Sequence, residues 1–349
     1  MTATASRRVL AAGRLIAFVL VTAAIVAVSS ERMFWYWSTS LSDHLIVTLA
    51  YSPAIAGVLW AISRHHLAGV TGLVLAAPLM GYYVEGVFTP IVYTGGPTPL
   101  FPLWFAAWHG VLSVGLLLCA IRWCLVTGRA SSLAALSAGL GVFWGLWSIT
   151  LTLPENVNDP ELIADHGGAL TVLDPLAFTG YAVLFTLVVM AGHALLGLGL
   201  WPARFDPPRW ARWLWMLYTA VMVIAWTFVV PWAAPMFVVL MAAQFWVLRR
   251  SERPGAHRSI LVDLDRPIRW PLLAALTPMA ALAAATYALL WWVDLSNDVL
   301  RVIFYGVIAV QTLAMAAALA WAVRRALRAP QPPVAPPVRP TGGSIGSTG

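Results

Sequence analysis

Residues 101–121 read FPLWFAAWHGVLSVGLLLCAI, and no side chain in this stretch carries a permanent charge. A helix of this length spans roughly 31 Å at about 1.5 Å per residue, which is enough to cross the hydrocarbon core of a bilayer. The whole chain of 349 residues is 60% hydrophobic and only 10% charged. Soluble domains carry about 25% charged residues, so the composition predicts an integral membrane protein built from α-helices.

Nine further apolar stretches of similar length predict the rest of the fold. The ten stretches are 9–29, 43–62, 67–88, 101–121, 132–153, 176–200, 211–231, 233–248, 271–293 and 299–323. We therefore expect an all-α, polytopic bundle of about ten transmembrane helices, forming one domain over residues 1–328 in the cell membrane. Residues 329–349 are rich in Pro and then in Gly and Ser, which predicts a disordered tail.

The distribution of charge predicts the orientation. With the N-terminus in the cytoplasm, the arginines fall on the cytoplasmic side of the ten stretches except for Arg32 and Arg301. Most acidic residues fall on the outer face: Glu31, Asp43, Glu155, Asp159, Glu161, Asp165, Asp174, Asp294 and Asp298. Both termini are then cytoplasmic. The basic surplus reflects membrane topology, so we expect membrane lipids as partners and no nucleic acid.

An internal similarity links the third and fourth stretches to the fifth and sixth. The motif Glu-x-Val-x-x-Pro occurs at 85–90 and at 155–160, residues 90–95 match 175–180, and residues 107–116 match 191–200. Three matches in the same order predict a parallel duplication with units 67–122 and 131–204. Chance similarity between apolar helices is the alternative.

Ionisable side chains inside the apolar stretches are the strongest candidates for function. Glu85 is the only acidic residue that we expect within a span, and an ionised carboxylate there would cost a few kcal/mol, about 2.5–3.5, unless it is paired or faces water. His109 and His193 are the only mid-span histidines and fall at similar depths. Because Glu85 falls nearer the outer surface, we expect contact with His109 only if residues 94–99 dip into the membrane.

Aromatic residues near these positions are candidates for lining a substrate cavity. They are Tyr82, Tyr93, Trp104, Trp108, Trp144 and Trp147. Their ring faces would stabilise a cation, although aromatic belts at the membrane surface are the commoner reason for such enrichment.

These features favour an enzyme that acts on a hydrophobic, isoprenoid-like substrate. Glu85 would donate a proton and His109 would assist as its partner or base, starting cyclisation, hydration or isomerisation. Glu155 and His193, at the matching positions of the second unit, complete the candidate catalytic set. The stretch from Glu85 to Trp104 resembles integral-membrane enzymes that hydrate carotenoids, and no residue role is carried over from this short likeness.

Three alternatives remain open. His109 and His193 are candidate axial ligands of one b-type haem, with Gly110, Gly192 and Ala194 giving the porphyrin space. Glu85 is also a candidate coupling site of a proton-driven transporter. In the third alternative these side chains only make interhelical hydrogen bonds.

Common enzyme motifs are absent from the sequence. It has no histidine box, HExxH, nucleophile elbow or Walker loop. The acidic loop from Glu155 to Asp174 could bind a divalent cation, but a solvated loop is favoured. We therefore predict no metal site, and no cofactor other than the alternative haem.

Overall fold

The computed structural model describes residues 3–33, 40–96, 98–153, 173–251 and 259–328, with side chains from residue 12 onward. The described chain is helical and contains no strand within these ranges. The predicted all-α membrane fold is confirmed. The tail at 329–349 and most of the acidic outer loop, including Glu155, lie outside the described residues.

The first half of the chain forms one short helix and five long helical rods, and three of the rods change helix type along their length. The elements are α1 (Ala3–Ala27) with η1 (Val28–Arg32), α2 (Leu41–Arg64), α3 (Gly69–Ala76) with α4 (Pro78–Tyr83) and η2 (Val84–Phe88), the short α5 (Ile91–Thr94), α6 (Leu100–Phe105) with η3 (Ala106–Ala120) and α7 (Ile121–Thr127), and α8 (Ala130–Thr150). The segments η1, η2 and η3 are π-helical.

The second half begins after the acidic loop. Its elements are α11 (Pro175–Leu195) with η4 (Leu196–Leu200), α12 (Arg209–Thr227), α13 (Ala233–Ser251), α14 (Ile260–Leu264), the 3-10 turn η5 (Trp270–Leu276) with α15 (Thr277–Val293), and α16 (Asn297–Arg328). Residues 90–95 and 175–180, which match in the predicted duplication, differ in structure: the first group forms the separate α5, whereas the second begins the continuous α11. The predicted duplication stays a prediction.

Nine described helices are long and apolar enough to cross a membrane. They cover the predicted stretches except 211–231, which forms α12. This helix carries Arg209 and Arg212 in its first turns, ends at Thr227 and packs against α13. The protein is thus a multi-pass membrane protein, and the count of ten spans stays a prediction.

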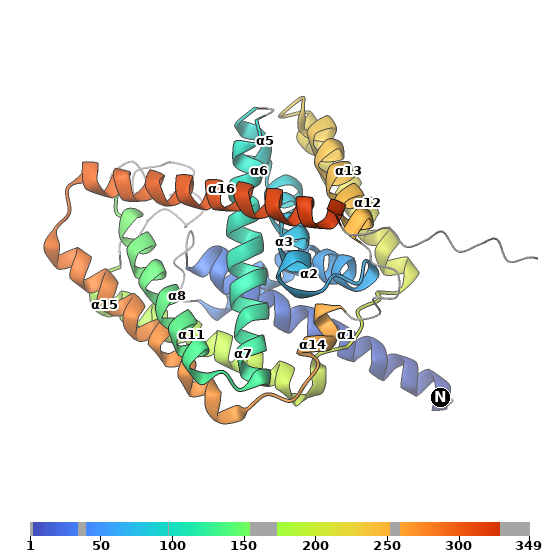
Figure 1. The fold of residues 1–349 in the computed structure, drawn as a ribbon, viewed down its shortest axis with the longest axis horizontal. Helices are drawn as coiled ribbons and strands as arrows, with labels where there is room; N and C mark the ends of the chain where they lie inside the picture. Colours follow the sequence, from blue (N-terminus) through green and yellow to red (C-terminus); the bar gives the residue numbers. More distant parts are fainter. Residues whose placement is uncertain (1–2, 34–39, 97, 154–172, 252–258, 329–349) are drawn as a thin grey trace, which may run out of the picture.

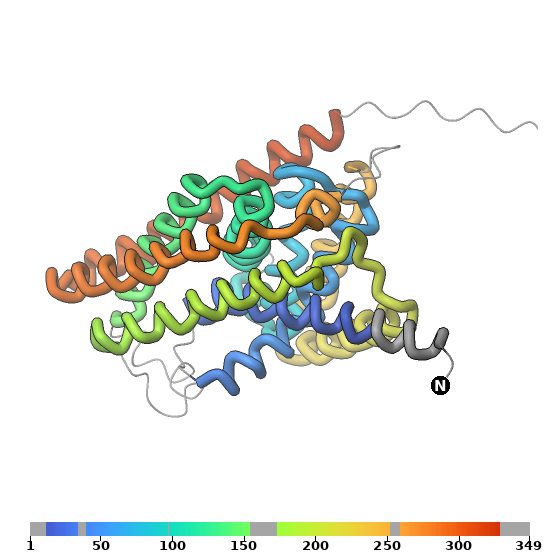
Figure 2. The backbone as a smooth tube through the Cα atoms, turned by 90° about the horizontal axis from the view of Figure 1, so that it is seen from below, coloured from blue at the N-terminus to red at the C-terminus, as the bar shows by residue number. Residues whose placement is uncertain are grey.

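A central rod organises the packing. Figure 1 shows α6, η3 and α7 running upright through the middle of the molecule, with α16 crossing them. In Figure 2, α1, α11, α15 and α16 run roughly alongside one another, and the central rod is seen nearly end-on. The helices α8 and α15 pack tightly because Gly141 and Gly145 face the Met279 and Ala283 carbonyl oxygens, where an added Cβ would lie 2.4 Å away. The central rod of α6, η3 and α7 contacts elements from both halves of the chain.

Candidate functional site

The rods that carry Glu85 and His109 approach each other closely because two glycines lie between them. A Cβ added at Gly81 would lie 2.4 Å from the Phe105 carbonyl oxygen, and one added at Gly110 would lie 2.3 Å from the Ala77 carbonyl oxygen. Ordinary non-bonded carbon contacts are about 3.5–4.0 Å, so neither position has room for a side chain. The two glycines thus bring α4 and η3 into backbone contact.

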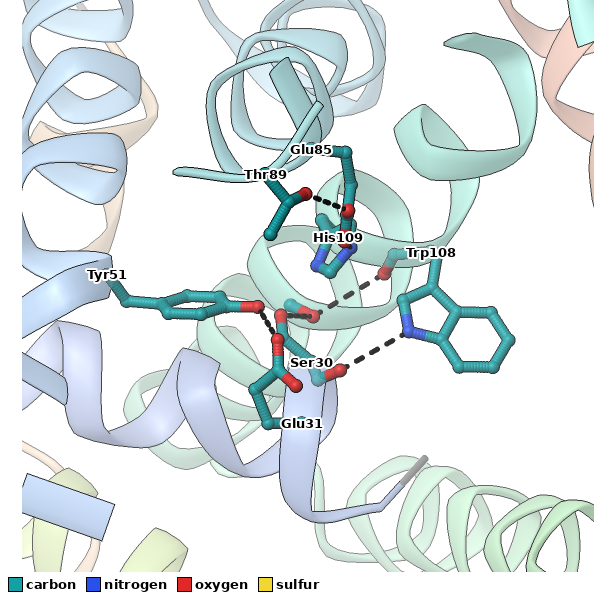
Figure 3. A network of polar contacts seen from close by, with 8 residues as sticks. Ser30, Glu31, Tyr51, Glu85, Thr89, Trp108 and His109 are labelled. Atoms are coloured by element: carbon teal, nitrogen blue, oxygen red, sulfur yellow. Dashed lines mark hydrogen bonds and ion pairs between the residues drawn. The ribbon is translucent and has the colours of Figure 1, made fainter. Parts of the chain in front are cut away.

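Glu85 and His109 form a buried pair across this contact. His109 Nε2 lies 2.8 Å from Glu85 Oε1, and Thr89 donates its hydroxyl to Oε2 at 2.7 Å (Figure 3). His109 is fully buried and Glu85 is 7% exposed. The pair satisfies both carboxylate oxygens at a depth where an unpaired charge would be costly.

The directions of the two side chains explain this contact, and the expected inward dip of residues 94–99 stays a prediction. Side chains point back toward the N-terminus of their own helix, and α4 and η3 run in opposite directions. Glu85 and His109 therefore reach toward the level at which Gly81 meets Phe105. Counting residues from the cytoplasmic ends placed their Cα atoms at different depths and left out these opposite side-chain directions.

A second acidic residue lies beside this pair. Glu31 was expected at the outer face, and it lies in the last turn of the apolar helix Ala12–Arg32, where Tyr51 donates its hydroxyl to Oε1. The Tyr51 ring centroid lies 6.2 Å from that of His109, and Glu31 is close enough to interact electrostatically with both His109 and Glu85. The sequence had not singled out Glu31 as a site residue.

Uncharged polar groups connect the helix that carries Glu31 to the one that carries His109. The Ser30 and Ser113 hydroxyls lie 2.7 Å apart, and Trp108 donates its indole N–H to the Ser30 carbonyl at 3.4 Å. Ser30, Ser113 and Trp108 are all buried. These bonds hold η1 against η3, so Glu31 has a fixed position relative to the pair (Figure 3).

Three π-helical segments meet at this cluster. Ser30 and Glu31 lie on η1, Glu85 on η2, and Trp108, His109 and Ser113 on η3. Each π turn replaces the usual i to i−4 hydrogen bond with a wider one, and such segments occur frequently at functional sites. Sequence reasoning missed these turns, and their convergence marks this cluster as the candidate functional site.

His193 lies apart from the cluster. Its Nε2 lies 3.0 Å from the Leu117 carbonyl oxygen, eight residues and about two helical turns from His109 along the central rod. Gly110 and Gly192 pack against other parts of the chain, because a Cβ at Gly110 would meet Ala77 and one at Gly192 would meet Ile25 at 2.5 Å. The haem alternative stays a prediction. The structure thus brings Glu85 and His109 together but leaves His193 with a different partner.

The predicted aromatic residues divide among several contacts. Trp108 packs against Trp147 at 4.7 Å and Trp104 at 6.1 Å between ring centroids, whereas Trp144 packs against Phe178 and Tyr181.

The two tyrosines lie elsewhere. Tyr82 lies in a small cluster with Ala77 and Met315, and Tyr93 donates its hydroxyl to the Gly86 carbonyl at 2.8 Å. Phe105, which the sequence did not single out, has its ring centroid 6.0 Å from that of His109.

The geometry allows a proton to move between Glu85 and His109 without a change in the net charge of the pair. An ionised Glu85 with a protonated His109 has no net charge, and a protonated Glu85 with a neutral His109 has none either. His109 Nδ1 is buried and has no hydrogen-bond partner among the described residues. A neutral His109 that donates through Nε2 to Glu85 would keep Nδ1 as a proton acceptor.

Replacing Tyr51 with Phe tests whether Glu31 depends on its hydrogen bond. The variant leaves a buried carboxyl oxygen without this donor, and we expect a loss of about 1–3 kcal/mol in the free energy of unfolding. The measurement is unfolding of the purified protein in mixed micelles with increasing denaturing detergent. Tyr305→Phe, at a side chain that is 65% exposed, is the matched control. Equal stability of the two variants would show that the Tyr51 bond contributes nothing.

Comparison of the chain with models of known protein families, with curated proteins and with solved structures finds no match. The geometry of the cluster is therefore the basis for assigning its chemistry.

Proposed function

We propose that the protein is a membrane enzyme in which Glu85 protonates a carbon–carbon double bond of a hydrophobic, isoprenoid-like substrate. The observation that carries the proposal is the buried contact between Glu85 and His109. The Nδ1 nitrogen of His109 has no hydrogen-bond partner among the described residues. An acid and a base in direct contact are the groups that acid-initiated isomerisation, cyclisation or hydration requires.

The proposed reaction returns its proton at the end of each cycle. Glu85 in its acid form transfers a proton to one alkene carbon, and the alkene π electrons form the new C–H bond and leave a carbocation. The cation cyclises or shifts and then loses a proton from a neighbouring carbon, or water adds and loses a proton. His109 Nδ1 accepts that proton and Nε2 returns one to Glu85. Exchange of the Nδ1 proton with water then restores the Nε2–H tautomer before the next cycle.

The aromatic side chains support the cationic stage of this reaction. The rings of Tyr51 and Phe105 lie 6.2 and 6.0 Å from the His109 ring, and Trp108 is packed against Trp104. Aromatic ring faces stabilise cations by about 0.5–2 kcal/mol, more strongly where water is excluded. A hydrocarbon substrate also suits a site that is enclosed by apolar helices.

Solvent deuterium provides a test that works before the product is identified. Membranes that contain the protein are incubated in D₂O with a mixture of isoprenoid alkenes, and the extracted lipids are analysed by mass spectrometry. Protonation from Glu85 places one deuterium on carbon, in a product isomeric with the substrate or larger by one water. Absence of any protein-dependent deuterated product across the mixture would contradict the proposal.

Proton-coupled transport is the second candidate, and Glu31 is the observation that favours it. A second carboxyl group near His109 provides two sites between which a proton could move. Proton uptake into vesicles that accompanies solute uptake and disappears in Glu85→Gln would favour this function.

The haem alternative would require both His109 and His193 to leave their present partners, and a Soret band lost in His109→Ala and in His193→Ala would support it.

A further inference from the structure

A groove between α2 and α12 has the size and charge of a site for a single amphiphile. Its volume is about 770 Å³, within the range of about 300–1,000 Å³ that is usual for small-molecule sites. Pro53 and Ala56 of α2 line one side, and Trp210, Trp213 and Trp215 of α12 line the other. Gly57 permits this arrangement because a Cβ there would lie 2.8 Å from the Trp215 ring.

One end of the groove is positively charged. Arg209 and Arg212 of α12 line it, and Arg204 lies in the loop that precedes this helix. Asp206 is shared between Arg204 at 3.7 Å and Arg212 at 3.5 Å, so these four residues carry three positive charges and one negative charge. The surplus matches an anion with more than one oxygen acceptor, such as a phosphate group.

The start of α12 adds to the positive potential. Pro208 caps the helix without a side-chain hydrogen bond, and the first turn contains no acidic residue. Helix N-termini favour negative charge, and Asp206 offsets only part of the positive charge that Arg209 and Arg212 place there. A phosphate at the end of the groove would satisfy both the arginines and the helix dipole.

The apolar remainder of the groove identifies the kind of anion. Trp210 and Trp213 are 69% and 59% exposed on a helix whose Leu214, Leu217 and Val221 are exposed as well, as expected for a surface that faces lipid. A free phosphate ion would leave this apolar wall uncovered. We infer that the groove binds one anionic phospholipid, with its phosphate at Arg209 and Arg212 and an acyl chain between α2 and α12.

Native mass spectrometry of the purified protein with dioleoyl phosphatidylglycerol tests this inference. We expect one lipid to be retained, and at least tenfold less retention in the double variant R209Q/R212Q. A56F, which fills the groove without changing charge, should reduce retention similarly. R249Q/R250Q removes two exposed arginines from the end of α13 and should retain the lipid as the unmodified protein does.

Competition and headgroup specificity decide between sources of the anion. Phosphatidylcholine with the same acyl chains should bind at least tenfold more weakly, and millimolar inorganic phosphate should not displace phosphatidylglycerol. Equal retention of the two lipids would overturn the inference. Full retention of phosphatidylglycerol by R209Q/R212Q would also overturn it, provided that thermal unfolding shows this variant to be as well folded as the control. Tighter binding of a prenyl phosphate than of phosphatidylglycerol would also overturn it.

Discussion

Glu85→Gln is expected to lower protein-dependent deuterium incorporation by at least about 10²-fold and up to about 10⁴-fold. The amide keeps the size of the side chain and can still bond to His109 and Thr89, but it cannot donate the proton that begins the reaction. Removal of a positioned general acid typically costs this factor. The measurement is the rate of formation of deuterated product in D₂O at equal protein content.

A second carboxyl-to-amide variant provides the control for that result. Asp298→Asn changes an exposed side chain that pairs only loosely with Arg301 at 3.4 Å, and it should leave the rate unchanged. A Glu85→Gln protein that retains the rate of Asp298→Asn would exclude Glu85 as the acid. The pair would then have only the structural role of an interhelical hydrogen bond.

Gly81→Ala and Gly110→Ala are expected to have the next largest effect. Each added methyl group would lie 2.3–2.4 Å from a carbonyl oxygen of the facing backbone, so the helices must separate. Overpacking of this kind costs about 1–3 kcal/mol in the free energy of unfolding. A displacement of about 1 Å between reacting groups can also lower the rate about 10²-fold. Both quantities are measured on the same purified samples.

Gly139→Ala is the matched control for these two variants. Gly139 is exposed on α8, and an added Cβ would have no neighbour within 4 Å. Ala has a higher helix propensity than Gly by about 0.8–1.0 kcal/mol, so this variant should be as stable as the unmodified protein or more stable. Equal behaviour of Gly81→Ala and Gly139→Ala would show that close approach of α4 and η3 is not needed.

The sequence was sufficient to predict the fold class and the two central residues of the site. Apolar length predicts helices that cross a membrane, and the cost of a charge inside the bilayer singles out Glu85 and the two histidines. It named His109 as the partner of Glu85 but placed the two residues at different depths, because their contact depends on how closely the helix of His109 packs against α4. The glycines that decide it, Gly81 and Gly110, are inconspicuous among the 26 glycines of the chain.

The missed part of the site has a physical cause as well. Glu31 stands next to Arg32 at the end of the first apolar stretch, which is the usual composition of a loop at the membrane surface. Only the fold shows that η1 continues the helix and that Tyr51 lies within reach of the carboxyl group. A π turn has no clear residue signature, so the local sequence could not predict the convergence of η1, η2 and η3.

A double-mutant cycle on the Glu85–His109 pair is the decisive experiment, because it requires no substrate. Glu85→Met, His109→Leu and the double variant are unfolded in mixed micelles, and the free energies are compared with that of the unmodified protein. Each single variant leaves a buried polar partner unpaired, whereas the double variant leaves neither. We predict that the double variant costs at least about 1 kcal/mol less than the sum of the two single costs. Additivity to within about 0.5 kcal/mol would contradict the pair on which the candidate site rests.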